Sequence, residues 1–208
     1  MTGPNPLHYG WWLASRSAGV VSLTAVSISV IIGLLMANGL PRGRGMKRRL
    51  LPLHESTALA GLVAIGVHGL TLMGDRFMHP SLTNIAVPFT SAYRPVFTGL
   101  GIIAGWLAVI LGLSFYARKQ VGAKLWRKLH RATVVVWALG VIHTLGAGTD
   151  AGATWLRAIV VVGGVPIILL FLRRVLPAPA ARCSAPSPQR RPARPGAELA
   201  AKIGRAHV

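Results

Sequence analysis

Four histidines in two apolar segments are the residues of this sequence best suited to chemistry. His54 and His68 are fourteen positions apart in LHESTALAGLVAIGVHGL, and His130 and His143 are thirteen apart in LHRATVVVWALGVIHTLG. Neutral imidazole binds transition metals, and two axial imidazoles on a haem iron leave no open position for substrate, which suits electron transfer. The residue types and their spacing therefore predict two metal sites that carry electrons.

The spacing of the histidines fits the depth of a membrane if both segments are helices. At 1.5 Å per residue, the steps of fourteen and thirteen residues correspond to about 21 and 19.5 Å. A hydrocarbon core is about 30 Å thick. If the two segments run in the same direction, His54 meets His130 near one face and His68 meets His143 near the other. We therefore expect two haems stacked within one bilayer.

An ideal helix suits the second histidine segment less well than the first. Successive residues rotate by about 100°, so His54 and His68 lie about 40° apart, whereas His130 and His143 lie about 140° apart. The second segment must therefore kink, contain a π-type irregularity or present its metal groups at different azimuths. Gly140 is the weak point that we expect.

Zinc binding and plain packing are the alternative interpretations of these histidines. Zinc prefers four ligands, and the one carboxylate near either pair is Glu55. A histidine inside a membrane span is often a hydrogen-bonded packing residue, which would leave a haem-free scaffold or transporter. Four histidines at matched depth favour haem instead. The sequence has no C-x-x-C-H motif, so the haem would be b-type and not covalently attached.

The segments that must position the histidines are apolar enough to cross a membrane. Hydrophobic residues make up 52% of the 208 positions and charged residues 13%, against about 25% charged residues in soluble domains. A membrane helix needs roughly 20 largely apolar residues. Five stretches qualify, the fourth if its helix begins near Trp126: residues 19–37, 56–73, 96–116, 132–146 and 153–172. The sequence thus predicts an all-α integral membrane bundle of about five transmembrane helices.

The basic residues predict how this bundle is oriented. Nineteen of the 23 follow the first, third and fifth spans, and the other side has Arg16, Arg76, Arg94 and Arg157. Lys and Arg accumulate in cytoplasmic loops, so we expect the N-terminus outside and the C-terminus in the cytoplasm. The predicted location is the bacterial cytoplasmic membrane, with several passes. Because the net charge of +19 then reflects topology, we predict no nucleic-acid partner.

The two histidine motifs, H-x13-H and H-x12-H with WRKLHR opening the second, resemble those of the ferric reductase-like transmembrane domain. That superfamily includes NADPH oxidases, ferric reductases and the haem-binding subunit of the periplasmic methionine-sulfoxide reductase system. The resemblance covers about residues 10–172 and all four histidine positions. This sequence departs from the family in two ways. The family often has six helices, of which this chain would lack the first, and the flavin and nicotinamide domains of the oxidases and ferric reductases do not follow the last helix.

The resemblance implies a transmembrane protein with two b-type haems, the membrane subunit of an oxidoreductase. Electrons would come from a cytoplasmic flavin or flavoprotein partner and leave to an extracytoplasmic acceptor. An ascorbate- or quinone-linked di-haem cytochrome and the haem-free scaffold or transporter are the alternatives. Sequence alone identifies neither the donor nor the acceptor.

Two arginines and two aspartates are further candidates for roles near the histidines. Haem propionates are negative and commonly meet basic side chains, so Arg16 on the sparsely charged side and Arg131 beside His130 are candidate cofactor-binding residues. Asp75 and Asp150 lie at the outer face, where they could bind a cationic acceptor or cap helices, and we interpret them as helix caps.

We expect three regions along the chain. Residues 1–17 form an extracytoplasmic N-terminus, residues 18–175 the haem domain, and residues 176–208 a disordered basic tail rich in Pro, Ala and Arg. Residues 203–208, IGRAHV, resemble the translation of a sequencing-library adapter, in which case the natural protein would continue differently. We therefore assign no function to these six residues, which include His207.

Overall fold

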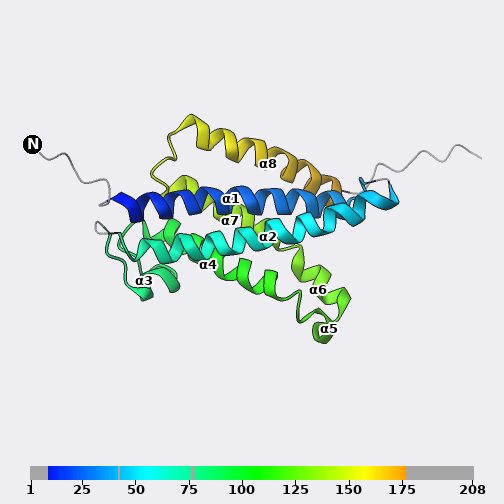
Figure 1. Cartoon of the computed structure of the whole chain (residues 1–208), viewed down its shortest axis with the longest axis horizontal. Helices are drawn as coiled ribbons and strands as arrows, with labels where there is room; N and C mark the ends of the chain where they lie inside the picture. The colour runs from blue at the N-terminus through cyan, green and yellow to red at the C-terminus, as the bar shows by residue number, and fades with distance from the viewer. Residues whose placement is uncertain (1–8, 42, 76–77, 177–208) are drawn as a thin grey trace, which may run out of the picture. The chain divides into compact units, whose positions relative to one another are not determined.

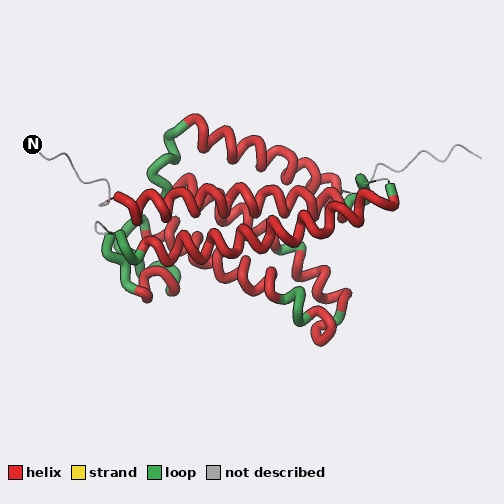
Figure 2. The backbone as a smooth tube through the Cα atoms, in the orientation of Figure 1, coloured by secondary structure: helices red, strands yellow, loops and turns green. Residues whose placement is uncertain are grey.

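The structure is a computed structural model that describes residues 9–41, 43–75 and 78–176. In this part of the chain all regular secondary structure is helical (Figures 1 and 2). The eight helices are α1 (Gly10–Ala37), α2 (Arg44–Leu72), α3 (Leu82–Ala86), α4 (Pro95–Leu113), α5 (Arg118–Val121), α6 (Ala123–His130), α7 (Thr133–Ala147) and α8 (Thr154–Val175).

Five helical segments are long and apolar enough to cross a membrane, so the predicted fold class is confirmed. They are Gly10–Ala37, Gly45–Leu72, Pro95–Leu113, Ala123–Ala147 and Thr154–Val175. The fourth combines α6 and α7 and begins just before Trp126, as the sequence suggested. Several side chains on these helices are both apolar and more than half exposed, among them Leu59, Val63, Val162 and Leu169. Apolar outer faces of this kind are typical of surfaces that contact lipid.

The observed boundaries differ from the predicted ones mainly at the first two helices. The first helix begins at Gly10, within the segment assigned to an extracytoplasmic N-terminus, because residues 10–18 other than Arg16 are apolar or small and can continue it. The second begins at Arg44 and contains Pro52, so that His54 lies well inside a helix. Residues 1–8 and the predicted tail beyond Leu176 lie outside the described residues.

Helix α1 is the central element of the bundle. It packs along α2 over most of its length and also contacts α7 and α8, while α4 packs on α7 and touches α2 (Figure 1). The main buried cluster joins α1, α7 and α8 through Leu23, Val30, Trp137 and Ile167. The two histidine-bearing segments, α2 and α6–α7, therefore each pack against a long helix: α1 lies beside α2, and α4 beside α7.

The irregularity that the histidine spacing requires occurs at Arg131–Ala132, between α6 and α7, and not at Gly140. Backbone amides here bond to the carbonyl three residues back, as in Ala132 to Leu129 at 2.9 Å and Val135 to Ala132 at 2.9 Å. A 3₁₀-type step turns the chain about 20° further than an α-helical step. Several such steps rotate His143 back towards the side of the helix that carries His130.

Candidate metal centres formed by two histidine pairs

The structure brings together the two histidine pairs that the sequence predicts. The ring centroids of His54 and His130 are 6.1 Å apart, with the ring planes at 84°. Those of His68 and His143 are 6.2 Å apart, with the planes at 73°. In each pair one ring comes from α2 and the other from the α6–α7 segment. All four side chains are half-buried.

The centroid separation suits two imidazoles on opposite sides of one metal ion. An imidazole nitrogen lies about 2 Å from a bound first-row metal, and the ring centre lies roughly 1 Å further from the metal. Two axial rings therefore have centroids about 6 Å apart. Both observed separations are close to this value. The two pairs fit a bis-histidine haem iron by this measure.

Three of the histidines have one ring nitrogen fixed by a backbone carbonyl. The Nδ1 atoms of His54, His68 and His143 lie 2.9, 2.8 and 2.9 Å from the carbonyl oxygens of Ser29, Ser15 and Phe97. A carbonyl oxygen only accepts, so Nδ1 must carry the proton and donate. The lone pair is then on Nε2, which is the nitrogen available to a metal. Such a bond at the other nitrogen also orients a metal-binding ring and raises its basicity.

Helix α1 carries the same small motif twice, once for each histidine of α2. The Ser15 and Ser29 hydroxyls lie 3.1 and 3.0 Å from Nδ1 of His68 and His54. They also donate to the backbone carbonyls of the same two histidines, at 3.1 and 3.3 Å. Four residues after each serine is a glycine, Gly19 or Gly33. A Cβ added at either glycine would come within 3.2 Å of the neighbouring imidazole.

This repeated S-x-x-x-G motif is not among the features predicted from the sequence, although the sequence carries a signal for it. Ser15 and Ser29 are fourteen positions apart, and so are His54 and His68 on the neighbouring helix. Fourteen residues are two heptads, the period at which positions recur on the contact line of two supercoiled helices. The signal is therefore a pair of matching intervals in two adjacent helices.

Helix α4 supports His143 in a similar way. Phe97 supplies the carbonyl, and four residues later Gly101 lies directly under the imidazole ring. A Cβ at Gly101 would overlap the ring of His143. The close approach of α4 to α7 at this point thus depends on a residue without a side chain.

His130 differs from the other three histidines. Its Nδ1 atom is buried and makes no hydrogen bond of normal geometry to the described residues, although the backbone of Leu111 interacts with the ring. Its ring instead stacks on that of Trp126, with centroids 4.9 Å apart and planes at 23°.

Of the two candidate propionate partners, Arg16 is engaged within the protein. Its guanidinium forms a two-pronged ion pair with Asp150, in which Nη2 lies 2.6 Å from Oδ1 and Nε contacts Oδ2. It also lies over the ring of Trp12, 5.0 Å from the centroid. The carboxylate of Asp150 therefore pairs with an arginine. The interpretation of this aspartate as a helix cap is wrong, because the C-cap of α7 is Gly148 and the N-cap of α8 is Ala153, without a side-chain cap. Arg131 is exposed, at the turn after His130.

The connection after α7, close to His143, is held by three arginines: Arg16 of α1, Arg157 of α8, and Arg94, the residue before α4. Besides the ion pair of Arg16, Arg94 donates to the carbonyl of Gly146 at 2.5 Å. Arg157 donates through Nε to the carbonyl of Ala151 at 3.0 Å. Cations near the carbonyl end of a helix are favourable. These contacts fix the last turn of α7 and thus the helix end that carries His143.

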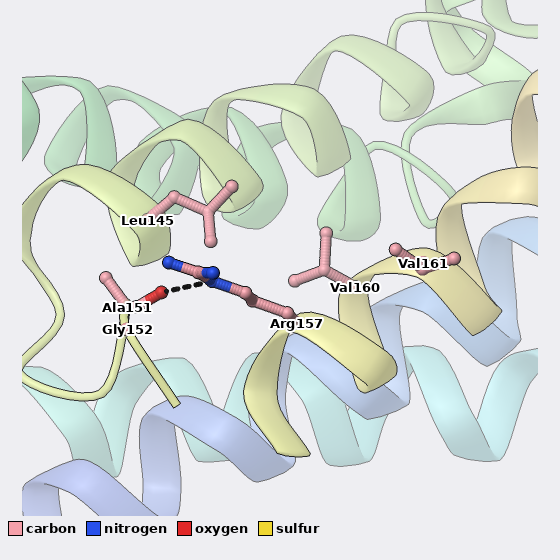
Figure 3. A pocket seen from close by; sticks show the side chains of 6 residues that line it. All are labelled: Leu145, Ala151, Gly152, Arg157, Val160 and Val161. Atoms are coloured by element: carbon pink, nitrogen blue, oxygen red, sulfur yellow. Dashed lines mark hydrogen bonds between the residues drawn. The ribbon is translucent and has the colours of Figure 1, made fainter. Parts of the chain in front are cut away.

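Arg157 also lines a cavity of about 510 Å³ beside the same connection. Figure 3 shows its guanidinium reaching towards Ala151, with Leu145 and Val160 nearby. None of the four histidines lines this cavity. Among the described residues there is also no group of three or more His, Cys, Asp or Glu side chains that could hold a metal ion. A zinc-type site with three or four protein ligands is thus not found in this part of the chain.

Comparison of the chain with models of protein families, with curated proteins and with solved structures gave no match.

Proposed function

We propose that this protein is a transmembrane di-haem b-type electron-transfer protein of the ferric reductase-like kind. Electrons from a cytoplasmic flavin or flavoprotein would enter at the His54/His130 pair and leave from the His68/His143 pair to an extracytoplasmic acceptor. The protein would then be the haem-bearing membrane subunit of an oxidoreductase whose flavin half is a partner.

One observation carries this proposal: two histidine pairs with almost equal ring separations recur at two levels of the same helices. A packing role would not require four histidines to lie close together in two pairs. Nor would a packing role require α1 to place a serine and a glycine, four residues apart, against both His54 and His68. Each site has two imidazoles and no third ligand from the described residues, which favours a metal whose other positions a macrocycle would fill.

A bound haem would supply reversible one-electron reduction and oxidation of its iron. The four histidines would hold the haems through Nε2, and for His54, His68 and His143 the Nδ1 bonds to backbone carbonyls leave that nitrogen free to bind. Two axial imidazoles leave no coordination position for a substrate, so the proposed chemistry is electron transfer alone.

The charge distribution supports the direction of transfer. Nineteen of the 23 basic residues belong to segments that we assign to the cytoplasm. An inside-negative potential favours outward movement of an electron by about 2.3 kcal/mol per 100 mV. Arg16 and Arg131 remain candidate partners for the haem propionates. Arg16 would then share its guanidinium between Asp150 and a propionate.

Proteoliposomes test the function directly. The purified protein, loaded with haem, is reconstituted into vesicles that contain ferricyanide, and a chemically reduced flavin is added outside. We expect reduction of the trapped ferricyanide that depends on the protein and is lost in His68→Ala. Equal rates for wild-type protein, His68→Ala and empty vesicles would contradict the proposal. Transfer from ascorbate or a quinol, and none from the flavin, would favour the alternative cytochrome.

A further inference from the structure

The environment of His130 breaks the pattern that the other three histidines follow. Each of the others donates from Nδ1 to a backbone carbonyl, whereas Nδ1 of His130 is buried without a hydrogen bond of normal geometry. The hydrogen bond that helps to set the ring plane of the other three histidines is thus missing at His130 in the described part of the chain. Something else must therefore hold the plane of this imidazole if it binds a metal.

The register of the helices shows which carbonyl would be expected to hold His130. The carbonyl of Phe97 accepts a hydrogen bond from His143. Leu111 is fourteen residues further along α4, on nearly the same face of that helix. Ser15 and Ser29 are related by the same interval on α1. The carbonyl of Leu111 does interact with the ring, but it also accepts a hydrogen bond of 2.6 Å from the hydroxyl of Ser114.

Trp126 completes a short network around this carbonyl. Its Nε1–H donates to Oγ of Ser114 at 3.1 Å, and Ser114 in turn donates to Leu111. The indole is thereby fixed at one edge. Its face stacks on the imidazole of His130, with centroids 4.9 Å apart and planes at 23°. Phe115 contacts the indole from another direction, with centroids 6.1 Å apart and planes at 66°.

We propose that Trp126 is a positioning residue for His130, which holds the imidazole plane by stacking in place of a hydrogen bond at Nδ1. The two residues are four apart on α6 and so lie on the same face of this helix. Tryptophan at a membrane interface is commonly an anchor. An anchor, however, requires neither a fixed Nε1 partner nor a stacked histidine. The assignment rests on the proposed function, since it concerns how His130 is presented to a haem iron.

Three variants of the full chain separate these roles. Trp126→Leu removes the aromatic face, and Trp126→Phe keeps an aromatic face but loses the Nε1–H donor. Trp137→Phe is the matched control, because Trp137 also donates from Nε1 to a serine, Ser27 at 3.0 Å, but has no ring contact with the four histidines. Each is compared by NMR of isotope-labelled histidine without haem, and by haem content and the low-spin EPR signals with haem. His130→Gln assigns the resonance of His130.

In the haem-free protein, Trp126→Leu should shift the ring resonance of His130 alone, because the shielding by the indole face is lost. With haem, the same variant should lose or broaden the EPR signal of the His54/His130 site and lower the haem content towards one per chain. Trp126→Phe should largely retain the EPR signal of this site and the haem content. Trp137→Phe should change neither of them.

A resonance of His130 that does not move in Trp126→Leu would overturn the stacking, and an unchanged EPR signal and haem content would overturn the positioning role. These results are distinct from failure of the proposed function. A wild-type protein that binds no haem would refute that function, whereas the NMR comparison would still decide whether Trp126 holds His130.

Discussion

The imidazole rings of His68 and His143 lie with their centroids 6.2 Å apart and their planes at 73°, although four helices, α3 to α6, separate α2 and α7 in the chain. Each ring is oriented by a different neighbour: His68 by the carbonyl of Ser15 on α1, and His143 by that of Phe97 on α4. Four helices thus cooperate at one site. The His54/His130 pair has nearly the same separation and draws on the same helix α1.

Removing one outer histidine should remove one haem and leave the other. In His143→Ala, only His68 is left to bind haem at the outer site, so we expect the haem content to fall from two to about one per chain. A pyridine haemochrome assay on detergent-purified protein measures this. His79→Asn is the control, because His79 is exposed and has a positive φ of 38° that asparagine tolerates. Two haems in His143→Ala would contradict the assignment of this residue.

The glycine under His143 offers a sharper test, since it leaves all four histidines in place. Gly101→Ala puts a Cβ where the imidazole ring lies, so the ring must move and the outer haem should be lost or its spectrum altered. Gly105→Ala lies one turn further along α4, and its Cβ would meet only Ile65 at 3.5 Å. We expect this second variant to resemble the wild type. Equal haem spectra for the two variants would argue against close packing of α4 on His143.

The serine hydroxyls of α1 should matter less than the backbone carbonyls beside them. Ser15→Ala and Ser29→Ala each remove hydrogen bonds to one histidine but leave its Nδ1 bond to the backbone. A hydrogen bond between membrane helices contributes about 0.6 kcal/mol on average. Each variant should therefore keep both haems and lose little thermal stability. Complete loss of a haem in either variant would show that the hydroxyl, and not the carbonyl, orients the ring.

The ion pair between Arg16 and Asp150 should stabilise the end of the bundle that carries His68 and His143. Its side chains are 32% and 18% exposed, so screening by solvent limits its contribution to about 1 kcal/mol. Arg16→Gln and Asp150→Asn should each lower the Tm, and the double variant should lower it by less than the sum. Differential scanning fluorimetry in detergent measures this coupling, with Arg48→Gln as an exposed control. Additive effects would mean that the pair is not energetically coupled.

The sequence was sufficient to predict the spans and the pairing of the histidines. Apolar length alone determines which segments can cross a bilayer. Because His54 and His68 are spaced almost as His130 and His143 are, only one arrangement of parallel helices matches their depths. These predictions depend on intervals along single helices, which can be read directly from the sequence.

Features that depend on contacts between helices were predicted less well. Arg16 stands out in the sequence because basic residues are scarce on its side, but its partner Asp150 is 134 positions away and could not be inferred. Glycine is the usual weak point of a helix, so the sequence favours Gly140 as the place where the second histidine segment breaks. The actual break at Arg131–Ala132 follows instead from local 3₁₀-type bonding that no residue type signals.

We propose that this bundle holds two haems, each between two histidines. The most direct test is a dithionite-reduced minus oxidised absorption spectrum of the purified protein, with haem quantified per chain. The chain is expressed with ample haem supply and purified in detergent. We predict a low-spin b-type spectrum with two haems per chain. A colourless protein with a featureless difference spectrum would contradict the claim and leave the four histidines as packing residues of a scaffold or transporter.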